Sequence, residues 1–354
     1  MQIDPVIQSI LVIRRDNIGD LVCTTPLIAA LRKHFPVARI DALVNSYNLP
    51  VLAENPYLDH VFAYTKAKHR QPGESVVGVY WRRWRMMQSL RKTSYDLAII
   101  ASTRQTARPL ALARQVKAKH ILGFTEEGKP GQQHIALQVP YVQRAGLHLV
   151  EELAELLIPL GITGAIPALT VCATEAAHQQ AQSRLATLPP APLTLAIHIS
   201  SRKPPQRWPA VQFIELMRGL HARHQVRFML FWSPGDEHNP HHPGDDRKAA
   251  EIMAAVADLP VLAYPTEALS ELIGGLSVCD AMICSDGGAM HVGAGLGKPI
   301  VCFFGNSDAT VWRPWGVPYR LLQKPSRDVK DIAADEALAA FTELLPEIKR
   351  GSML

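Results

Sequence analysis

Asp20 is the first candidate for acid–base chemistry in this sequence. It follows an apolar run, Ile10–Arg14, that is typical of a buried strand, and Gly19-Asp20 then begins a segment with helical periodicity. An aspartate is ionised at neutral pH and can accept a proton from an attacking hydroxyl group. Gly19 would let a ligand approach the backbone closely. An aspartate at the beginning of a helix can equally serve as a cap that stabilises the helix by about 1 kcal/mol, so base and cap both remain open.

A second group of polar residues lies between two apolar runs, 281–284 and 300–304. Asp286, Gly287 and Gly288 follow the first run, and His291 comes about one helical turn later. Glycines at the beginning of a helix leave backbone N–H groups open to a phosphate, and the helix dipole adds attraction. Turn formation alone could explain the glycines, but their combination with Asp286 and His291 favours an anion site.

The loop after the apolar run 193–199 carries hydroxyl and basic groups that can bind phosphate. These are Ser200, Ser201, Arg202, Lys203 and Arg207. A solvated basic loop is the alternative. In the loop after the next run, Asp236 or Glu237 could accept hydrogen bonds from a sugar hydroxyl or a base amine.

We expect no metal and no cofactor. The histidines after Glu237, at positions 238, 241 and 242, are interrupted by prolines and do not fit the spacing of metal ligands on one helix face. The chain has five cysteines and no CxxC pair, which indicates buried reduced thiols.

Positive charge is concentrated between Lys66 and Lys92. This segment carries a net charge of +7, whereas the whole chain carries +5. Tyr80, Trp81, Trp84, Met87 and Leu90 fall within one half of a helical wheel, and Arg82 and Arg85 lie on the other. An aromatic, arginine-rich helix suits a membrane surface with anionic head groups. The alternative is a helix with one face in the core and the other in solvent.

Strand-like and helix-like segments alternate along the 354 residues. Near-continuous apolar runs predict buried parallel strands; they are Ile10–Arg14, Ile40–Val44, Leu97–Ala101, Leu193–Ile199, Val226–Phe231, Ala281–Cys284 and Ile300–Phe304. Helix-like segments between them include Leu21–Phe35, Leu147–Leu160, Glu175–Leu188, Val211–His224, Arg247–Ala257 and Leu269–Cys279. This order predicts an α/β protein of doubly wound units, whose ligands bind beyond the carboxyl ends of the strands.

The alternation restarts after a Gly/Pro-rich stretch near residue 165, so we predict two domains, 1–170 and 171–332, that face each other across a cleft. The last segment, 333–354, is predicted to be a helix that packs back on the first domain. No apolar run reaches the ~18 residues that span a bilayer, and the N-terminus does not resemble a signal peptide. We therefore expect a cytoplasmic location.

The Gly19-Asp20 motif followed by TTPLIAALR, together with DGGAMHVGAGLGKPIVCFFG, resembles glycosyltransferase family 9, the lipopolysaccharide heptosyltransferases. The usual form of the second motif is D-[ST]-G-x-x-H, so Gly287 stands where the family has a hydroxyl residue. The resemblance covers nearly the whole chain. It implies a GT-B fold of two Rossmann-like domains and metal-independent, inverting transfer of heptose from ADP-heptose to the inner core of lipopolysaccharide.

The resemblance also implies roles for individual residues. It makes Asp20 the general base and the first domain the acceptor-binding domain. An anionic lipid-linked acceptor would explain the segment of net charge +7, so we expect Lys66, Arg82, Arg83 and Arg85 to be acceptor contacts. The resemblance places the donor diphosphate in the second domain, at Asp286, Gly288 and His291. From the loop residues themselves we expect further donor contacts, which are Ser200, Ser201, Lys203, Arg207, Glu237 and Gly287. Gln206 stands where the family often has a lysine, so Lys203 or Arg207 is expected to supply that charge.

An acceptor of this kind implies binding at the inner face of the inner membrane and no nucleic-acid partner. Two alternatives to the heptosyltransferase remain. One is a transferase or epimerase of the same fold that uses another nucleotide sugar, of UDP type. The other is a non-catalytic peripheral membrane protein that binds lipopolysaccharide precursors.

Overall fold

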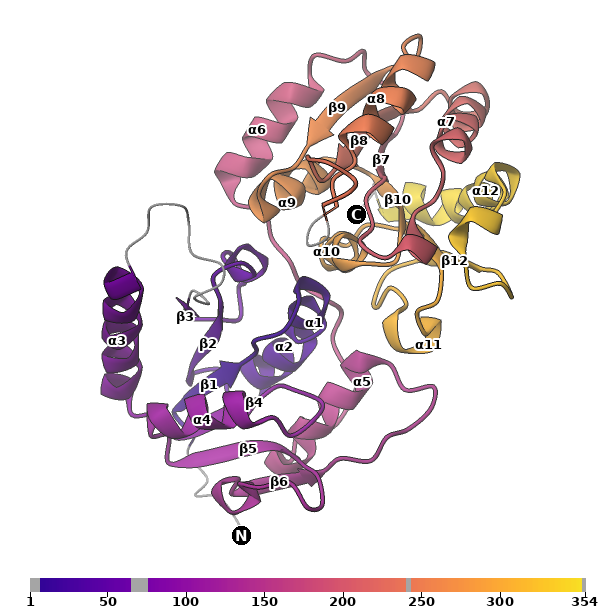
Figure 1. Cartoon of the computed structure of the whole chain (residues 1–354). Helices are drawn as coiled ribbons and strands as arrows, with labels where there is room; N and C mark the ends of the chain where they lie inside the picture. Colours follow the sequence, from indigo (N-terminus) through magenta and orange to yellow (C-terminus); the bar gives the residue numbers. More distant parts are fainter. Residues whose placement is uncertain (1–6, 65–75, 240–242, 352–354) are drawn as a thin grey trace. The chain divides into compact units, whose positions relative to one another are not determined.

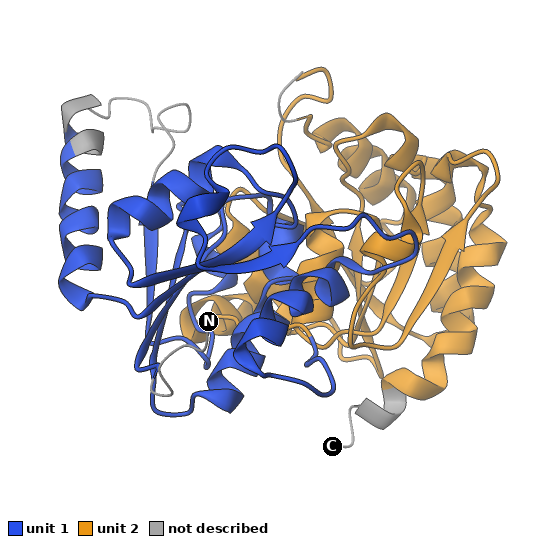
Figure 2. Cartoon of the chain, turned by 90° about the horizontal axis from the view of Figure 1, so that it is seen from below, with its two compact units in different colours: residues 1–168 blue, residues 169–354 orange. Residues whose placement is uncertain are grey.

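The computed structural model describes residues 7–64, 76–239 and 243–351 (Figure 1). The chain divides into two compact units, residues 1–168 and 169–354, coloured blue and orange in Figure 2. The division lies two residues before the boundary expected from the sequence. Each unit contains a six-stranded sheet in which all strand pairs are parallel.

Unit 1 has the strand order β3-β2-β1-β4-β5-β6. Its strands are β1 (Ser9–Ile13), β2 (Arg39–Asn45), β3 (His60–Tyr64), β4 (Leu97–Ile100), β5 (His120–Thr125) and β6 (Leu137–Pro140). Its helices are α1 (Ile18–Val22), α2 (Thr25–His34), α3 (Val76–Thr93), α4 (Ala107–Val116) and α5 (Leu149–Ala154). The chain order reverses between β1 and β4, so the loop after β1 begins at the point where such sheets bind ligands.

Unit 2 repeats this topology with the order β12-β11-β10-β7-β8-β9. Its strands are β7 (Thr194–His198), β8 (Arg227–Trp232), β9 (Val261–Pro265), β10 (Ala281–Ser285), β11 (Ile300–Phe304) and β12 (Tyr319–Gln323). Its helices are α6 (Glu175–Leu185), α7 (Ala210–His224), α8 (Asp246–Ala255), α9 (Leu269–Ser277), α10 (Gly288–Gly295), α11 (Ala309–Trp312) and α12 (Ala334–Gly351). Here the order reverses between β7 and β10, whose Cα partners include His198 and Cys284.

Seven of the eight central strands were predicted from the sequence, whereas the central strand β5 and the four edge strands were not. β1 and β10 are buried almost throughout, which gives the continuous apolar runs that the sequence shows. The edge strands β3, β6, β9 and β12 keep partly exposed residues and carry a weaker signal. The predicted helix 21–35 is in fact two helices, because the chain turns at Cys23-Thr24 and α2 then begins at Thr25, with Pro26 in its first turn.

Helix α12 lies in unit 2, where it packs on α7, β11 and β12. Its apolar face, including Phe341, Leu344 and Ile348, belongs to the core formed by this sheet. This differs from the expectation that the segment packs on the first domain. Burial of an apolar stripe against the nearest exposed sheet face explains the placement. Among the described residues, no helix combines the length and the apolarity needed to cross a membrane.

Candidate functional site

Asp20 is the third residue of α1, the short helix that begins after the loop that follows β1. The N-cap of this helix is Asn17, so Asp20 does not itself occupy the cap position. Its Oδ2 accepts hydrogen bonds from the backbone N–H and from Nδ2 of Asn17, each at 3.1 Å. The Asp20 side chain is 17% exposed. The carboxylate therefore completes a capping box and still reaches solvent at the carboxyl edge of the sheet.

Arg14, the first residue after β1, is the main charged partner of Asp20. Its side chain is 3% exposed, and its Nη2 donates to Oδ1 of Asp20 at 2.9 Å. Nη1 donates to the carbonyl oxygen of Ala101, just beyond β4. Nε lies 3.2 Å from Oδ2 of Asp16. Arg14 thus connects the two strands at the reversal point of the sheet to the candidate base.

Two asparagines hold the loop that carries Arg14 and Asp20. Nδ2 of Asn45 donates to the carbonyl oxygens of Arg15 and Asp16, and Nδ2 of Asn48 donates to that of Asp16 at 2.6 Å. Both asparagines are buried. Side-chain hydrogen bonds to loop carbonyls replace those that water would make, and they restrict the loop to one conformation.

In unit 2, Asp286 follows β10 and is 8% exposed. Its Oδ2 accepts a 2.6 Å hydrogen bond from Nε2 of Gln206, which also donates to Oγ of Ser307 at 2.5 Å. Burial raises the pKa of Asp286, while its hydrogen bonds with Ser307 and Gln206 and the charge of Lys203 oppose that rise. The family lysine would bring a cation into this contact, whereas Gln206 supplies only a neutral amide.

Gly287 and Gly288 lead from Asp286 into α10. Gly287 has extended backbone, and a Cβ at this position would meet no heavy atom within 4 Å. The open space beside Gly287 leaves room for a ligand at the beginning of an eight-residue helix. His291 is 2% exposed and its ring lies 5.9 Å from that of Trp312, edge to face.

The basic loop after β7 does not present all its charges to solvent. Nη2 of Arg207 lies 2.5 Å from Oδ1 of Asp245, whose side chain is fully buried. Lys203 is exposed at the beginning of the short helix Pro204–Gln206. Oγ of Ser200 accepts from the backbone N–H of Ser233, and Oγ of Ser201 donates to Oε1 of Gln206. Lys203 is thus better placed than Arg207 to meet an added phosphate.

Lys248 and His198 lie beside this ion pair. Nζ of Lys248 donates to the carbonyl oxygen of Ile199 at 3.0 Å, and burial lowers the pKa of Lys248 to about 8 despite the nearby Asp245. Burial, together with the charge of Lys248, lowers the pKa of His198 to about 4. Both effects follow from the cost of holding a charge away from water.

Glu237 lies in the loop after β8, where its carboxylate is 24% exposed and forms an ion pair with Arg247. The base of this loop is narrow, since a Cβ on Gly244 would lie 2.2 Å from the backbone of Gly235. Backbone hydrogen bonds from Gly244 to Asp236 and from Asp245 to Ser233 close it. The two glycines thus permit the close backbone approach that fixes the start of the Glu237 loop.

Helix α3 presents its aromatic and basic side chains to solvent. Trp81 and Trp84 are 55% and 59% exposed, and Arg82, Arg83 and Arg85 are exposed as well. The guanidinium of Arg85 lies 4.6 Å from the ring centre of Trp81. The helix is anchored by other residues, Met87 and Leu90, which are buried in the core of unit 1. Lys66 lies outside the described residues.

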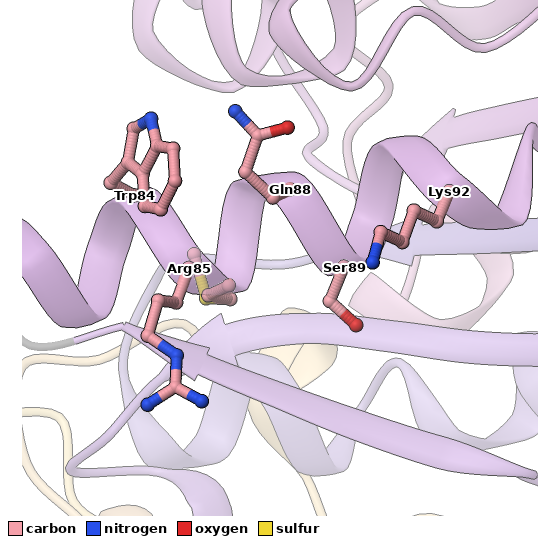
Figure 3. Close-up of a pocket in the computed structure, with 6 residues that line it drawn as sticks. Trp84, Arg85, Gln88, Ser89 and Lys92 are labelled. Atoms are coloured by element: carbon pink, nitrogen blue, oxygen red, sulfur yellow. The ribbon is translucent and has the colours of Figure 1, made fainter.

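A shallow hollow runs along the same helix. Its lining residues are Trp84, Arg85, Met86, Gln88, Ser89 and Lys92. In Figure 3, Trp84 and Gln88 project to one side of the helix and Arg85 to another. The two tryptophans therefore do not serve as core residues, which favours the interpretation of α3 as a contact surface.

The sequence profile of glycosyltransferase family 9 (heptosyltransferase) matches residues 83–337. The chain belongs to this family. Lipopolysaccharide heptosyltransferase 3 of Escherichia coli is 25% identical over 353 residues, which cover 95% of this chain and 99% of that protein. Lipopolysaccharide heptosyltransferase 2 of Salmonella typhimurium is 25% identical over 323 residues, 89% of this chain and 87% of that one.

Solved structures show the same fold. A family 9 glycosyl transferase from Veillonella parvula has a TM-score of 0.81 at 20% identity and covers 98% of this chain and 99% of its own. The ADP-heptose lipopolysaccharide heptosyltransferase II of E. coli has a TM-score of 0.74 at 18% identity, with coverage of 96% and 99%. The predicted family, the enzyme class and the fold class, two Rossmann-like units of the GT-B type, are confirmed.

Three polar residues that contact the candidate side chains of this glycosyltransferase were not predicted from the sequence. Arg14, Asp245 and Ser307 contact the candidate residues Asp20, Arg207 and Asp286 respectively. Arg14 could have been predicted as a site residue, because it directly follows an apolar strand. No sequence pattern marks Asp245 or Ser307, since both lie in loops whose contacts depend on the fold.

The lowered pKa of His198 predicts how the stability of the glycosyltransferase depends on pH. Above about pH 6.5, His198 is neutral in both the folded and the unfolded chain. As the pH falls from 6.5 towards 4, the unfolded chain binds a proton that the folded protein does not bind, so the free energy of unfolding falls by at most about 3 kcal/mol. His198→Gln should reduce this loss in urea titrations over that pH range.

The matched control is His238→Gln, because the side chain of His238 is 82% exposed. It should leave the pH dependence of unfolding as in the native protein. Identical pH dependence for the native protein and the His198 variant would contradict the depressed pKa of His198.

Proposed function

We propose that this protein transfers heptose from ADP-heptose to the inner core of lipopolysaccharide, with inversion and with Asp20 as general base. Family membership supports heptosyl transfer, and it favours this function over the epimerase and the non-catalytic alternatives. The observation that carries the assignment of the base is the position of Asp20, a carboxylate held at the carboxyl edge of the sheet by Asn17 and Arg14. In this proposal unit 1 supplies the base and the acceptor contacts, and unit 2 supplies the donor contacts.

The reaction uses these groups in a simple way. The acceptor hydroxyl gives its proton to Asp20 while its oxygen bonds to the anomeric carbon, and the bond from that carbon to the β-phosphate oxygen breaks on the opposite face. The developing charge on ADP needs donors in a site without water, each contributing about 3 kcal/mol. Backbone N–H groups at Gly288 and the ammonium of Lys203 are suited to this role, whereas Arg207 is paired with Asp245.

Replacement of the base tests the mechanism. Asp20→Asn should lower kcat by about 10²–10⁴-fold, because the amide cannot accept the proton. Stability should fall by about 1 kcal/mol through the weakened cap and further because the buried Arg14 loses its charge partner, so kcat is compared for the folded enzymes. Asp59→Asn is the control, since Asp59 forms an ion pair with Arg32 in the same unit and has no part in this mechanism. An Asp20→Asn enzyme with normal turnover would refute the role of Asp20.

The donor nucleotide is tested by isothermal calorimetry. We expect the protein to bind ADP at least about tenfold more tightly than UDP, a difference of ~1.4 kcal/mol. The similarity to heptosyltransferase structures described with ADP-heptose or ADP supports this expectation. Tighter binding of UDP would overturn the choice of donor and revive the alternative nucleotide sugar.

We propose further that the protein works in the cytoplasm at the inner face of the inner membrane, where α3 contacts anionic lipid head groups or the anionic acceptor. Exposed tryptophans beside exposed arginines support this interpretation. Each basic residue near an anionic membrane surface contributes about 1 kcal/mol of attraction. Replacement of Arg82, Arg83 and Arg85 by Gln should therefore weaken binding to anionic vesicles about 100-fold and raise the KM for the acceptor, with little change in ADP affinity.

The control replaces three exposed basic residues on α4 and at its C-cap, Arg108, Arg114 and Lys117, by Gln. It removes the same charge from the same unit, so an effect of net charge alone would appear in both variants. Equal loss of acceptor use and of ADP binding in the α3 variant would contradict the surface that we propose.

A further inference from the structure

The side chain of Arg14 is buried to an extent that is unusual for arginine. It is 3% exposed, although arginine is almost never buried without a partner. Arg14 directly follows β1, and β1 pairs with β4 at the point where the chain order of the sheet reverses. The cost of burying a guanidinium must be offset by specific contacts, and all of those seen lie at this carboxyl edge.

The contacts of Arg14 connect the sheet to Asp20. One terminal nitrogen, Nη1, donates to the carbonyl of Ala101 after β4, while the other, Nη2, donates to Oδ1 of Asp20. A guanidinium is a rigid planar fork, so its contact with β4 also fixes the direction of its bond to the carboxylate. Burial excludes the water that would otherwise let this ion pair rearrange.

The hydrogen bonds of Asp20 leave room for a proton. Oδ2 accepts two hydrogen bonds from Asn17, whereas Oδ1 accepts the single bond from Arg14 among the described residues. A carboxylate offers about four acceptor positions, two on each oxygen. Oδ1 therefore keeps one acceptor position, and the direction of that position is set by the Arg14–Asp20 bond.

We propose that Arg14 is a positioning residue for the transfer reaction: it holds the carboxylate of Asp20 so that the open position on Oδ1 receives the proton of the acceptor hydroxyl. This inference rests on the proposed role of Asp20 as base. Arg14 itself does not contact the sugar. Misplacement of a reacting group by about 1 Å costs about 10²-fold in rate.

The first test is the kinetics of Arg14→Ala in the full-length protein. We expect kcat to fall about 100-fold, while the Kd for ADP, measured by calorimetry, stays within twofold of the native value. Guanidinium ion added at millimolar concentration should restore part of kcat in Arg14→Ala and should not stimulate Asp20→Asn. Arg14→Lys keeps a cation but loses the planar fork, so it should have an intermediate kcat. If Arg14→Ala does not fold, the kcat of Arg14→Lys is the measurement that tests the proposal.

The second test is a double-mutant cycle. If Arg14 acts through Asp20, the double variant Arg14→Ala/Asp20→Asn should be as slow as Asp20→Asn alone. Arg39→Ala is the matched control, because Arg39 pairs with the buried Asp41 at 2.8 Å at the amino end of β2. This control should lose stability without a selective loss of kcat.

The outcomes separate the two proposals. Normal turnover by Asp20→Asn would refute the base and, with it, the role of Arg14. If Asp20→Asn is inactive but folded Arg14→Ala or Arg14→Lys turns over at the native rate, only the positioning role fails. A double variant much slower than Asp20→Asn, or a loss of stability in Arg14→Ala with unchanged kcat, would likewise overturn it.

Discussion

The burial of two parallel sheets is the constraint on which the rest of this structure depends. Strands such as β1 and β10 are covered on both faces and leave almost no place for a polar side chain within the sheet. Polar chemistry is therefore confined to the loops at the strand ends. Asp20 follows β1 and Asp286 follows β10, each beside the reversal of strand order in its own sheet. The same topology thus places one candidate carboxylate in each unit.

The three buried or half-buried carboxylates at these edges differ in how their charge is balanced. Asp20 has the guanidinium of Arg14, and Asp245 has that of Arg207. Asp286 instead meets the amide of Gln206 and the hydroxyl of Ser307, and burial raises its pKa. A neutral pair of donors compensates a buried charge less well than a cation does. The positive charge that acts on Asp286 is instead that of the exposed Lys203.

Helix α3 shows how exposure changes the meaning of a sequence pattern. The helical wheel places Trp81, Trp84, Met87 and Leu90 in one half, and that half could have been a single core face. In the structure only Met87 and Leu90 are buried, and both tryptophans are more than half exposed. Two large aromatic side chains exposed beside arginines form a surface of the kind that interaction sites often use, which agrees with the contact surface that we propose for α3.

The sequence alone determined the central strands other than β5, the position of Asp20 and Asp286 after two of them, and membership of the family, because continuous apolar runs and motif spacing are local properties. The edge strands β3, β6, β9 and β12 were not predicted from the sequence, because strands that are partly exposed mix polar with apolar residues. Only the tertiary structure decided that Arg14 holds Asp20 and that Arg207 is committed to Asp245. It also decided that α12 packs within unit 2. These are pairings between loops and helices that the folding of each sheet brings together, and no spacing along the chain encodes them.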